Sequence, residues 1–368
     1  MKFALNEEQI ALEDAVKDFF KSKVTSGVIR HAMENTAGIN FDIYDTMRNE
    51  LGLTSLIIEE QYGGFGASDL ELNIAMIQHG YYLVPSPLRT QTYTTILIQE
   101  CANQESKNHI LPKILAGDDI GAVVSDESTL KDLVINDGKI SGTIERVLFL
   151  EYASHITFVY DGSLIDIELK DEGINIKAQK SIDQTQPISK ITFDNTKCYV
   201  ISDGDISKQY EIAKARMAIL LSNEMFGCAS SAFDMSLAYA KERQQFGKAI
   251  GSFQSIKHKL AELYLELQNA KSLCQFAAYI SSIRNDAKDK NIHLSENEKD
   301  IRHVSSMAKY YVTKIFNNIA HENIQIHGGI GFTYEHDAHL YLKRFMATKF
   351  EFGGQDEHTK LLAEDIFN

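Results

Sequence analysis

Arg243 and its neighbours form the segment of this sequence whose residue types best suit the binding of an anion. The segment Lys241–Lys248 combines two lysines and an arginine with Phe246 and Gly247, and Gln254 follows shortly afterwards. A guanidinium binds a pyrophosphate through two parallel hydrogen bonds, so an arginine at such a turn can hold an anionic dinucleotide. An exposed turn between two helices, with no ligand, is the alternative interpretation of the same residues.

A glycine-rich turn, Gly328-Gly329-Ile330-Gly331, is the second candidate for nucleotide binding. Glycine lacks a Cβ, which lets the backbone approach a phosphate or a sugar closely and offer N–H donors. The turn follows a helical stretch rather than a strand, and no Gly-Lys-Ser/Thr occurs, so Rossmann and P-loop sites are disfavoured. A simple helix C-terminal cap is equally consistent with these residues.

Other common catalytic patterns are missing from the sequence. It has no Gly-x-Ser-x-Gly and no His-Glu-x-x-His, and its four cysteines lack Cys-x-x-Cys spacing. Serine hydrolase chemistry and a zinc site are therefore disfavoured, and we expect no bound metal. The cysteines are expected to be buried thiols in a reducing compartment.

The charge balance excludes several classes of partner. Lys and Arg number 37 against 51 Asp and Glu, a formal net charge of −14, and no basic arm offsets it. Nucleic-acid binding needs clustered cations, so we expect none. No stretch reaches the roughly 18–20 apolar residues of a membrane span, and the N-terminus carries acidic residues where a signal peptide would be apolar. We therefore expect a cytoplasmic protein.

Hydrophobic periodicity divides the chain into three regions that must position these turns. Helical spacing predicts a helical domain over 1–116, which opens with a cap at Asn6-Glu7-Glu8-Gln9. Short β-rich stretches separated by Asp-Gly turns predict a β domain over 117–203. Two long helical runs, 207–284 and 300–326, predict a helical bundle over 204–368, with a polar connector at 285–300. The predicted fold class is α+β and mostly α, with the β domain between two helical ones.

Several motifs occurring together resemble those of the acyl-CoA dehydrogenase family. They are the opening Leu5–Gln9, the turn Ile58–Gly66, the stretch Ala240–Leu260 and the stretch Gln325–Phe332. The resemblance extends over nearly the whole chain and implies an N-terminal helical domain, a middle β-barrel or sandwich, and a C-terminal helix bundle. Members of the family oxidise an acyl-CoA thioester to its α,β-unsaturated product with FAD. A carboxylate removes the α-proton while the β-hydrogen leaves as hydride, and an electron-transfer acceptor then reoxidises the flavin.

The resemblance assigns FAD binding to two groups of residues that act on a neighbouring subunit's cofactor. Arg243 and Phe246 contact that FAD, and Gln254 lies nearby. The second group approaches the adenine and ribose side of the same cofactor and consists of Gln325, Ile326, His327, Gly328 and Gly329. All of these residues match the family pattern here.

Residues that would serve the chain's own flavin depart from the family pattern. The family's Thr-Glu-Pro and Gly-Ser stretch, which hydrogen-bonds the flavin ring, is replaced by Val123–Leu130. The aromatic residue that covers the flavin in the family falls near Arg146 and Val147. The part of the site contributed in cis is therefore expected to be incomplete.

The catalytic base is the second departure. Many relatives carry it in a C-terminal Tyr-Glu-Gly, whereas Gly353 stands at the carboxylate's place here, and glycine cannot remove a proton. Some relatives carry it on an earlier helix, at a position that matches Met217, which is also unsuitable. Glu224 lies two turns further on the same helix face and is the candidate base; a helix-packing or interface role is the alternative, and Glu351 is a weaker candidate.

These departures favour one subunit of a heteromeric acyl-CoA dehydrogenase, with a second, similar chain providing the flavin-ring pocket and the base. The stretches His79–Pro85 and Phe352–Gln355 are similar to relatives that act on bulky, steroid-like acyl-CoA substrates. Three alternatives stay open: a self-sufficient homotetramer that uses Glu224 or Glu351, a flavin oxidase or monooxygenase, and a non-catalytic scaffold subunit.

Overall fold

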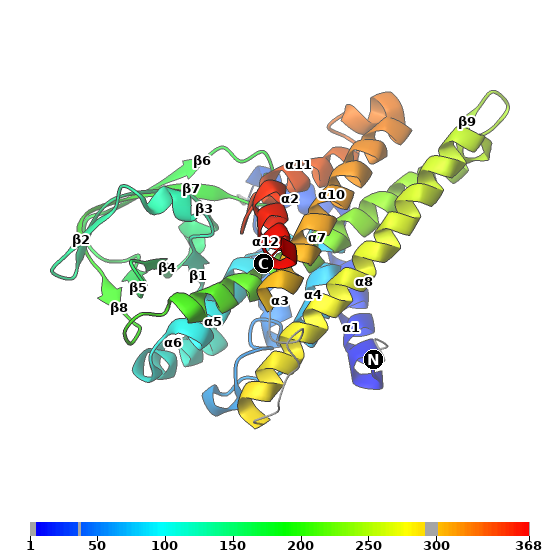
Figure 1. Cartoon of the computed structure of the whole chain (residues 1–368). Coiled ribbons are helices and arrows are strands. Elements are labelled where there is room, and N and C mark those ends of the chain that lie inside the picture. The colour runs from blue at the N-terminus through cyan, green and yellow to red at the C-terminus, as the bar shows by residue number, and fades with distance from the viewer. Residues whose placement is uncertain (1–4, 36–37, 291–300, 368) are drawn as a thin grey trace. The chain divides into compact units, whose positions relative to one another are not determined.

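The computed structural model describes residues 5–35, 38–290 and 301–367 (Figure 1). Contacts divide the chain into two compact units. The helical unit comprises 1–29, 69–84 and 218–368, and the sheet unit comprises 30–68 and 85–217. The three-domain division at 116 and 203 stays a prediction.

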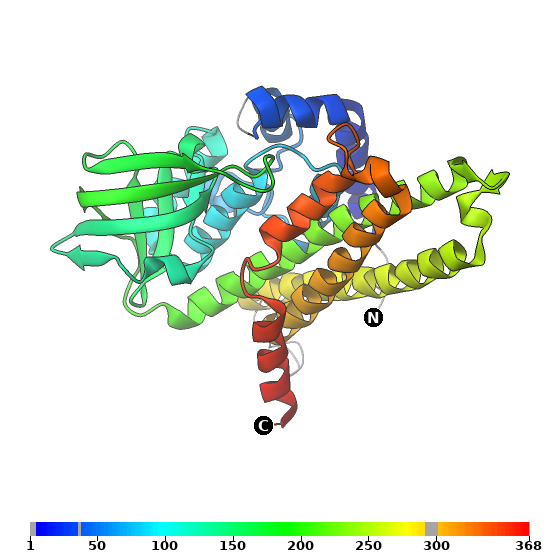
Figure 2. The ribbon, with the colours of Figure 1, turned by 90° about the horizontal axis from the view of Figure 1, so that it is seen from above.

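The helical unit is built from long helices whose apolar faces pack together. Its helices are α1 (Glu7–Lys23), α4 (Asp69–Tyr81), the C-terminal part of α7 (Ser207–Glu242), α8 (Gln254–Lys290), α10 (Ile301–His327), α11 (Ala338–Thr348) and α12 (Gln355–Phe367). Helix α10 packs against α8, α11 and α12, and α4 packs against α1 and α8 (Figure 2). The predicted capping box is confirmed: Asn6 and Gln9 exchange hydrogen bonds at the start of α1.

Close contact between α4 and α7 depends on two glycines. A Cβ on Gly80 would lie 2.0 Å from the carbonyl oxygen of Glu224, and one on Gly227 would lie 2.0 Å from that of Ile77. Cys228 also donates its thiol hydrogen to the carbonyl of Gly80, at 3.1 Å. Only residues without a Cβ permit this approach, which brings the side chain of Glu224 against α4.

The sheet unit holds two four-stranded sheets packed face to face. The first has the order β1-β4-β5-β8 and the second β2-β3-β7-β6. The strands are β1 (Gly121–Val123), β2 (Val134–Asn136), β3 (Lys139–Leu148), β4 (His155–Tyr160), β5 (Ser163–Glu168), β6 (Ile174–Gln179), β7 (Ile188–Lys197) and β8 (Tyr199–Val200). Inward residues of both sheets, such as Ile156 and Ile191, form one core. The predicted sandwich and the mostly helical fold class are confirmed.

Helices α3 (Phe41–Asn49), α5 (Leu88–Cys101) and α6 (Gln104–Ala116) complete the sheet unit, and α2 (Ser26–Asn35) crosses the boundary between the units. Helix α5 packs against β1 and α6 and is buried along most of its length. The four cysteines are buried, as predicted. Of the expected connector at 285–300, α8 extends to Lys290, and residues 291–300 lie outside the described residues.

A candidate FAD-binding edge and two candidate base positions

Arg243 and Phe246 lie in a tight hairpin that joins α7 to α8. Its two strands, β9 (Gln244–Gln245) and β10 (Lys248–Ala249), pair antiparallel around a two-residue turn. The turn residues Phe246 and Gly247 have φ values of 53° and 80°, the left-handed backbone that such hairpins require. Phenylalanine adopts this backbone with strain, yet its ring is 91% exposed. The hairpin therefore presents an aromatic ring and the exposed Arg243 to a ligand or partner.

The second predicted motif forms the end of α10 and the 3₁₀ turn η5 (Gly328–Phe332). Gln325, Gly328 and Gly329 are exposed, and a Cβ on either glycine would meet no atom of the described residues within 4 Å. Ile326 and His327 are instead buried, so their side chains face the protein. His327 donates from Nδ1 to the carbonyl of Asn323 at 2.7 Å, and burial lowers its pKa.

The structure brings the two motifs to the same end of the helices. The centroid of the His327 ring lies 4.3 Å from that of Tyr239, which is in the last turn of α7, four residues before Arg243. Gln254, also exposed, begins α8 directly after the hairpin. An exposed guanidinium and an open glycine backbone are groups that suit the pyrophosphate and sugar of a dinucleotide such as FAD. We call the exposed members of this set, Arg243, Phe246, Gln254, Gln325, Gly328 and Gly329, the trans edge.

Glu224 is held inside the helical unit by two basic side chains. Its carboxylate oxygen Oε1 lies 2.9 Å from Nη1 of Arg344 on α11 and 3.3 Å from Nδ1 of His79 on α4. All three side chains are 1% exposed or less. This geometry favours the packing role over the role of base, because the carboxylate is enclosed and already paired. Sequence reasoning missed both partners, which lie 145 and 120 residues away.

Gly353 occupies a left-handed turn between α11 and α12. Its φ is 104°, and a Cβ there would lie 2.9 Å from Oε2 of Glu357 and 3.1 Å from Nε2 of His358. Burial, and then the nearby Lys309 charge, lowers the pKa of His358 to about 4. A carboxylate-bearing residue at 353 would therefore be strained and would have to displace its neighbours. Glu351, the weaker candidate, is partly buried just before this turn.

The sheet unit places a charged pair at the cis flavin positions. Arg146, near which the resemblance places the family's flavin-covering aromatic residue, has a φ of 59° beside a bulge in β3. Its guanidinium forms an ion pair with Asp126, whose carboxylate also accepts the backbone N–H of Ser128 at 3.0 Å. These residues bind each other and offer no aromatic face to a flavin ring.

The described part of the chain contains neither a metal-binding cluster nor a helix that could span a membrane. Residues 5–35, 38–290 and 301–367 contain no group of three or more His, Cys, Asp or Glu side chains that could hold a metal ion. Over the same ranges, no helix has both the length and the apolar character needed to cross a membrane.

The helical unit and the β-sandwich together match the fold of the acyl-CoA dehydrogenases. The chain belongs to the acyl-CoA dehydrogenase family: residues 6–118 match "Acyl-CoA dehydrogenase, N-terminal domain" and residues 208–367 match "Acyl-CoA dehydrogenase, C-terminal domain". Members of this family are FAD-binding oxidoreductases that act on acyl-CoA, and the predicted family, activity and cofactor are confirmed.

The chain is similar along its whole length to individual relatives. It is 26% identical to acyl-CoA dehydrogenase IpdE2 of Mycolicibacterium smegmatis, covering 99% of this chain and 100% of that one. The ChsE4-ChsE5 complex of Mycobacterium tuberculosis contains a chain with 18% identity and a TM-score of 0.85, covering 100% of this chain and 99% of that one. The structure titled "Tcur3481-Tcur3483 steroid ACAD G363A variant" has 21% identity and a TM-score of 0.84, covering 98% of each chain.

Proposed function

We propose that this chain is one subunit of a heteromeric acyl-CoA dehydrogenase and contributes its trans edge to the FAD site of a partner chain. The observation that carries the proposal is the contrast between the two halves of the site. The trans edge presents an exposed arginine, an exposed aromatic ring and two open glycines. The cis positions hold an internal ion pair, and the position of the family's base is a left-handed glycine.

Each trans-edge residue has a role in this proposal. Arg243 binds the pyrophosphate of FAD, and Phe246 covers an apolar part of the cofactor. Gly328 and Gly329 let the backbone approach the adenosine half. Ile326 and His327 hold this backbone in place through their buried side chains. In this family the bound flavin supplies the acceptor for the substrate's β-hydrogen.

Proton removal is assigned to the partner chain. Abstraction of the α-proton needs a carboxylate within hydrogen-bond reach of the substrate. Gly353 has no side chain, and Glu224 is enclosed by Arg344 and His79. The titles of two solved structures with this fold name paired chains, which supports an assembly of two different subunits.

The proposed substrate is a bulky acyl-CoA, and the proposed electron acceptor is a separate electron-transfer protein. One of the solved structures is titled a steroid ACAD, and the stretches around Gly80 and Gly353 are similar to relatives of that kind. The self-sufficient homotetramer that uses Glu224 as base is the competing function.

Glu224→Gln in the co-expressed assembly distinguishes these two functions. We expect the kcat of dye-coupled acyl-CoA oxidation to change by less than about twofold, because loss of a catalytic base costs about 10²–10⁴-fold and Glu224 does not act as one. The assay is run at a temperature at which circular dichroism shows the variant folded. A fall in kcat of a hundredfold or more would contradict the proposal and identify Glu224 as the base.

A further inference from the structure

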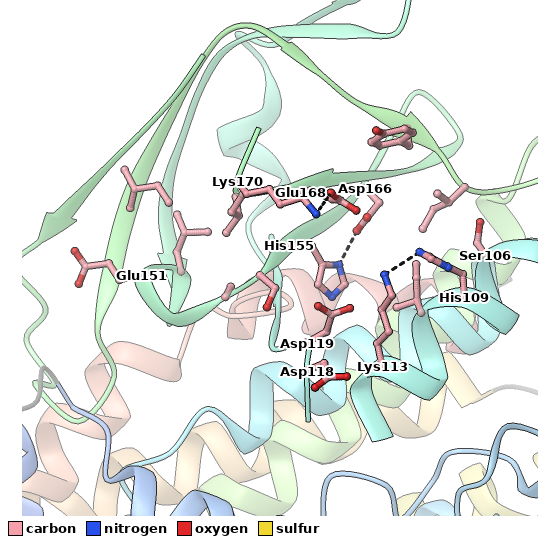
Figure 3. Close-up of a pocket in the computed structure, with 18 of the residues that line it drawn as sticks. Ser106, His109, Lys113, Asp118, Asp119, Glu151, His155, Asp166, Glu168 and Lys170 are labelled. Atoms are coloured by element: carbon pink, nitrogen blue, oxygen red, sulfur yellow. Dashed lines mark hydrogen bonds and ion pairs between the residues drawn. The ribbon is translucent and has the colours of Figure 1, made fainter. Parts of the chain in front are cut away.

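A cavity of about 860 Å³ lies in the sheet unit, apart from every residue of the trans edge. Helix α6, strands β4 and β5 and the loop before β1 surround it (Figure 3). Apolar side chains contribute part of the wall, including Ile110, Leu150 and Ile176. Its size is in the range of pockets that hold small organic molecules.

A His–Asp pair projects into this cavity. Nδ1 of His155 lies 2.7 Å from Oδ1 of Asp166, and the same oxygen accepts the hydroxyl of Thr157 at 2.8 Å. Asp166 therefore fixes the ring with its Nδ1 hydrogen inward and its Nε2 on the other edge. Figure 3 shows that edge turned toward Asp119 and Lys113. The ring is 4% exposed, and Nε2 has no hydrogen-bond partner among the described residues.

An unsatisfied buried polar atom points to a missing partner. Leaving such a group unpaired forfeits its hydrogen bonds to water with nothing in return, so native structures rarely do it. Strands β4 and β5 hold the ring in register, with Thr157 opposite Asp166, so it cannot turn away without breaking its bond to Asp166. A ligand oxygen at Nε2 would complete the set of hydrogen bonds.

The charges around the cavity restrict what can bind. Its carboxylates are Glu105, Asp118, Asp119, Glu151, Asp166 and Glu168, against the lysines Lys113 and Lys170. Lys170 is paired with Glu168 at 2.8 Å, and Lys113 contacts Nε2 of His109 at 2.8 Å. The excess of carboxylates disfavours an anion.

Binding of an organic cation beside the imidazole of His155 is disfavoured, because the ammonium of Lys113 lies nearby. Burial lowers the pKa of His155, but the hydrogen bond and charge of Asp166, together with the charge of Asp119, outweigh it and raise the pKa above its ordinary value. The carboxylate of Asp119 and the ammonium of Lys113 both lie on the Nε2 side of the ring, so an acceptor and a donor face this position. An uncharged group that can both accept and donate fits this position.

We propose that the cavity binds an uncharged alcohol with an apolar body, whose hydroxyl oxygen accepts a hydrogen bond from Nε2 of His155. The hydroxyl hydrogen then donates to the carboxylate of Asp119. This site is independent of the proposed function, because no trans-edge residue or candidate base takes part in it.

Three probes that share a cyclohexane ring test the charge selectivity of this site. Cyclohexanol, cyclohexanecarboxylate and cyclohexylammonium are titrated separately into the full-length chain, and the Cε1–H resonance of His155 is followed by NMR. The resonance is assigned to His155 because it disappears from the spectrum of the His155→Gln variant. We expect a saturable shift with cyclohexanol and little with the other two. No saturable shift with cyclohexanol, or an equal one with either charged probe, would overturn the proposal.

A pair of variants tests the role of the imidazole. Saturation-transfer NMR, which observes the probe, gives the Kd of cyclohexanol for each variant. His155→Gln is expected to weaken binding by about tenfold, the effect of losing one hydrogen bond to the probe. His321→Gln, at an exposed histidine of α10 that does not line the cavity, serves as the control and should leave the Kd unchanged. Equal affinity in His155→Gln and the unaltered chain would overturn the proposal.

Discussion

Replacing Arg344 with methionine is expected to lower the free energy of unfolding by about 3–5 kcal/mol, because it leaves a buried carboxylate without its guanidinium. Arg344 and Glu224 are each 1% exposed and lie 2.9 Å apart. Nδ1 of His79 lies 3.3 Å from Oε1 of Glu224, and this longer contact cannot by itself neutralise the charge of the carboxylate. Urea unfolding followed by circular dichroism measures the change.

The ion pair between Lys259 and Glu322 provides a matched control. Its two side chains are 2.7 Å apart but 39% and 29% exposed, so Lys259→Met should cost only about 0–1 kcal/mol. The double variant Glu224→Leu with Arg344→Met should recover much of the loss, since both charges are then removed. A loss in Arg344→Met no larger than that of the control would show that this buried cluster does not hold the helical unit together.

Arg243→Ala is expected to weaken FAD binding in the co-expressed assembly by about 10–100-fold, the effect of removing a charge-assisted pair of hydrogen bonds to a phosphate. The stability of the chain itself should not change, because Arg243 is exposed at the end of α7. Fluorescence titration of the apo-assembly with FAD measures the Kd.

Lys241→Ala is the control for Arg243→Ala, because Lys241 is an exposed cation two residues earlier, in the last turn of α7. It should change the Kd by less than about threefold, the size of a remote, screened charge effect. Equal effects of the two variants would mean that the hairpin attracts FAD only through its overall charge. An unchanged Kd in Arg243→Ala would remove this residue from the site.

Local signals in the sequence predicted most of the fold. Asn6 and Gln9 form the expected capping box, and the Asp-Gly pair at 161–162 forms the expected tight turn, with φ values of 48° and 70°. The register of β4 and β5 follows from this turn, so the placement of Asp166 opposite Thr157 could also have been derived. Such features depend on residues close in sequence, and a short window of the chain contains them.

Features that join distant segments could not be predicted in this way. The partners of Glu224 come from α4 and α11, and no spacing rule relates residues 145 or 120 positions apart. The burial of Ile326 and His327, by contrast, continues the helical period of α10, in which Ile319 and Asn323 are also buried.

The ratio of FAD to polypeptide tests the central claim most directly. It is measured from visible absorbance of the purified chain, first alone and then after co-expression with a second acyl-CoA dehydrogenase-like chain. A subunit that supplies only the trans edge should carry little FAD alone and a single FAD for each pair of chains in the assembly. A full complement of one FAD per chain in the protein purified alone would contradict the account.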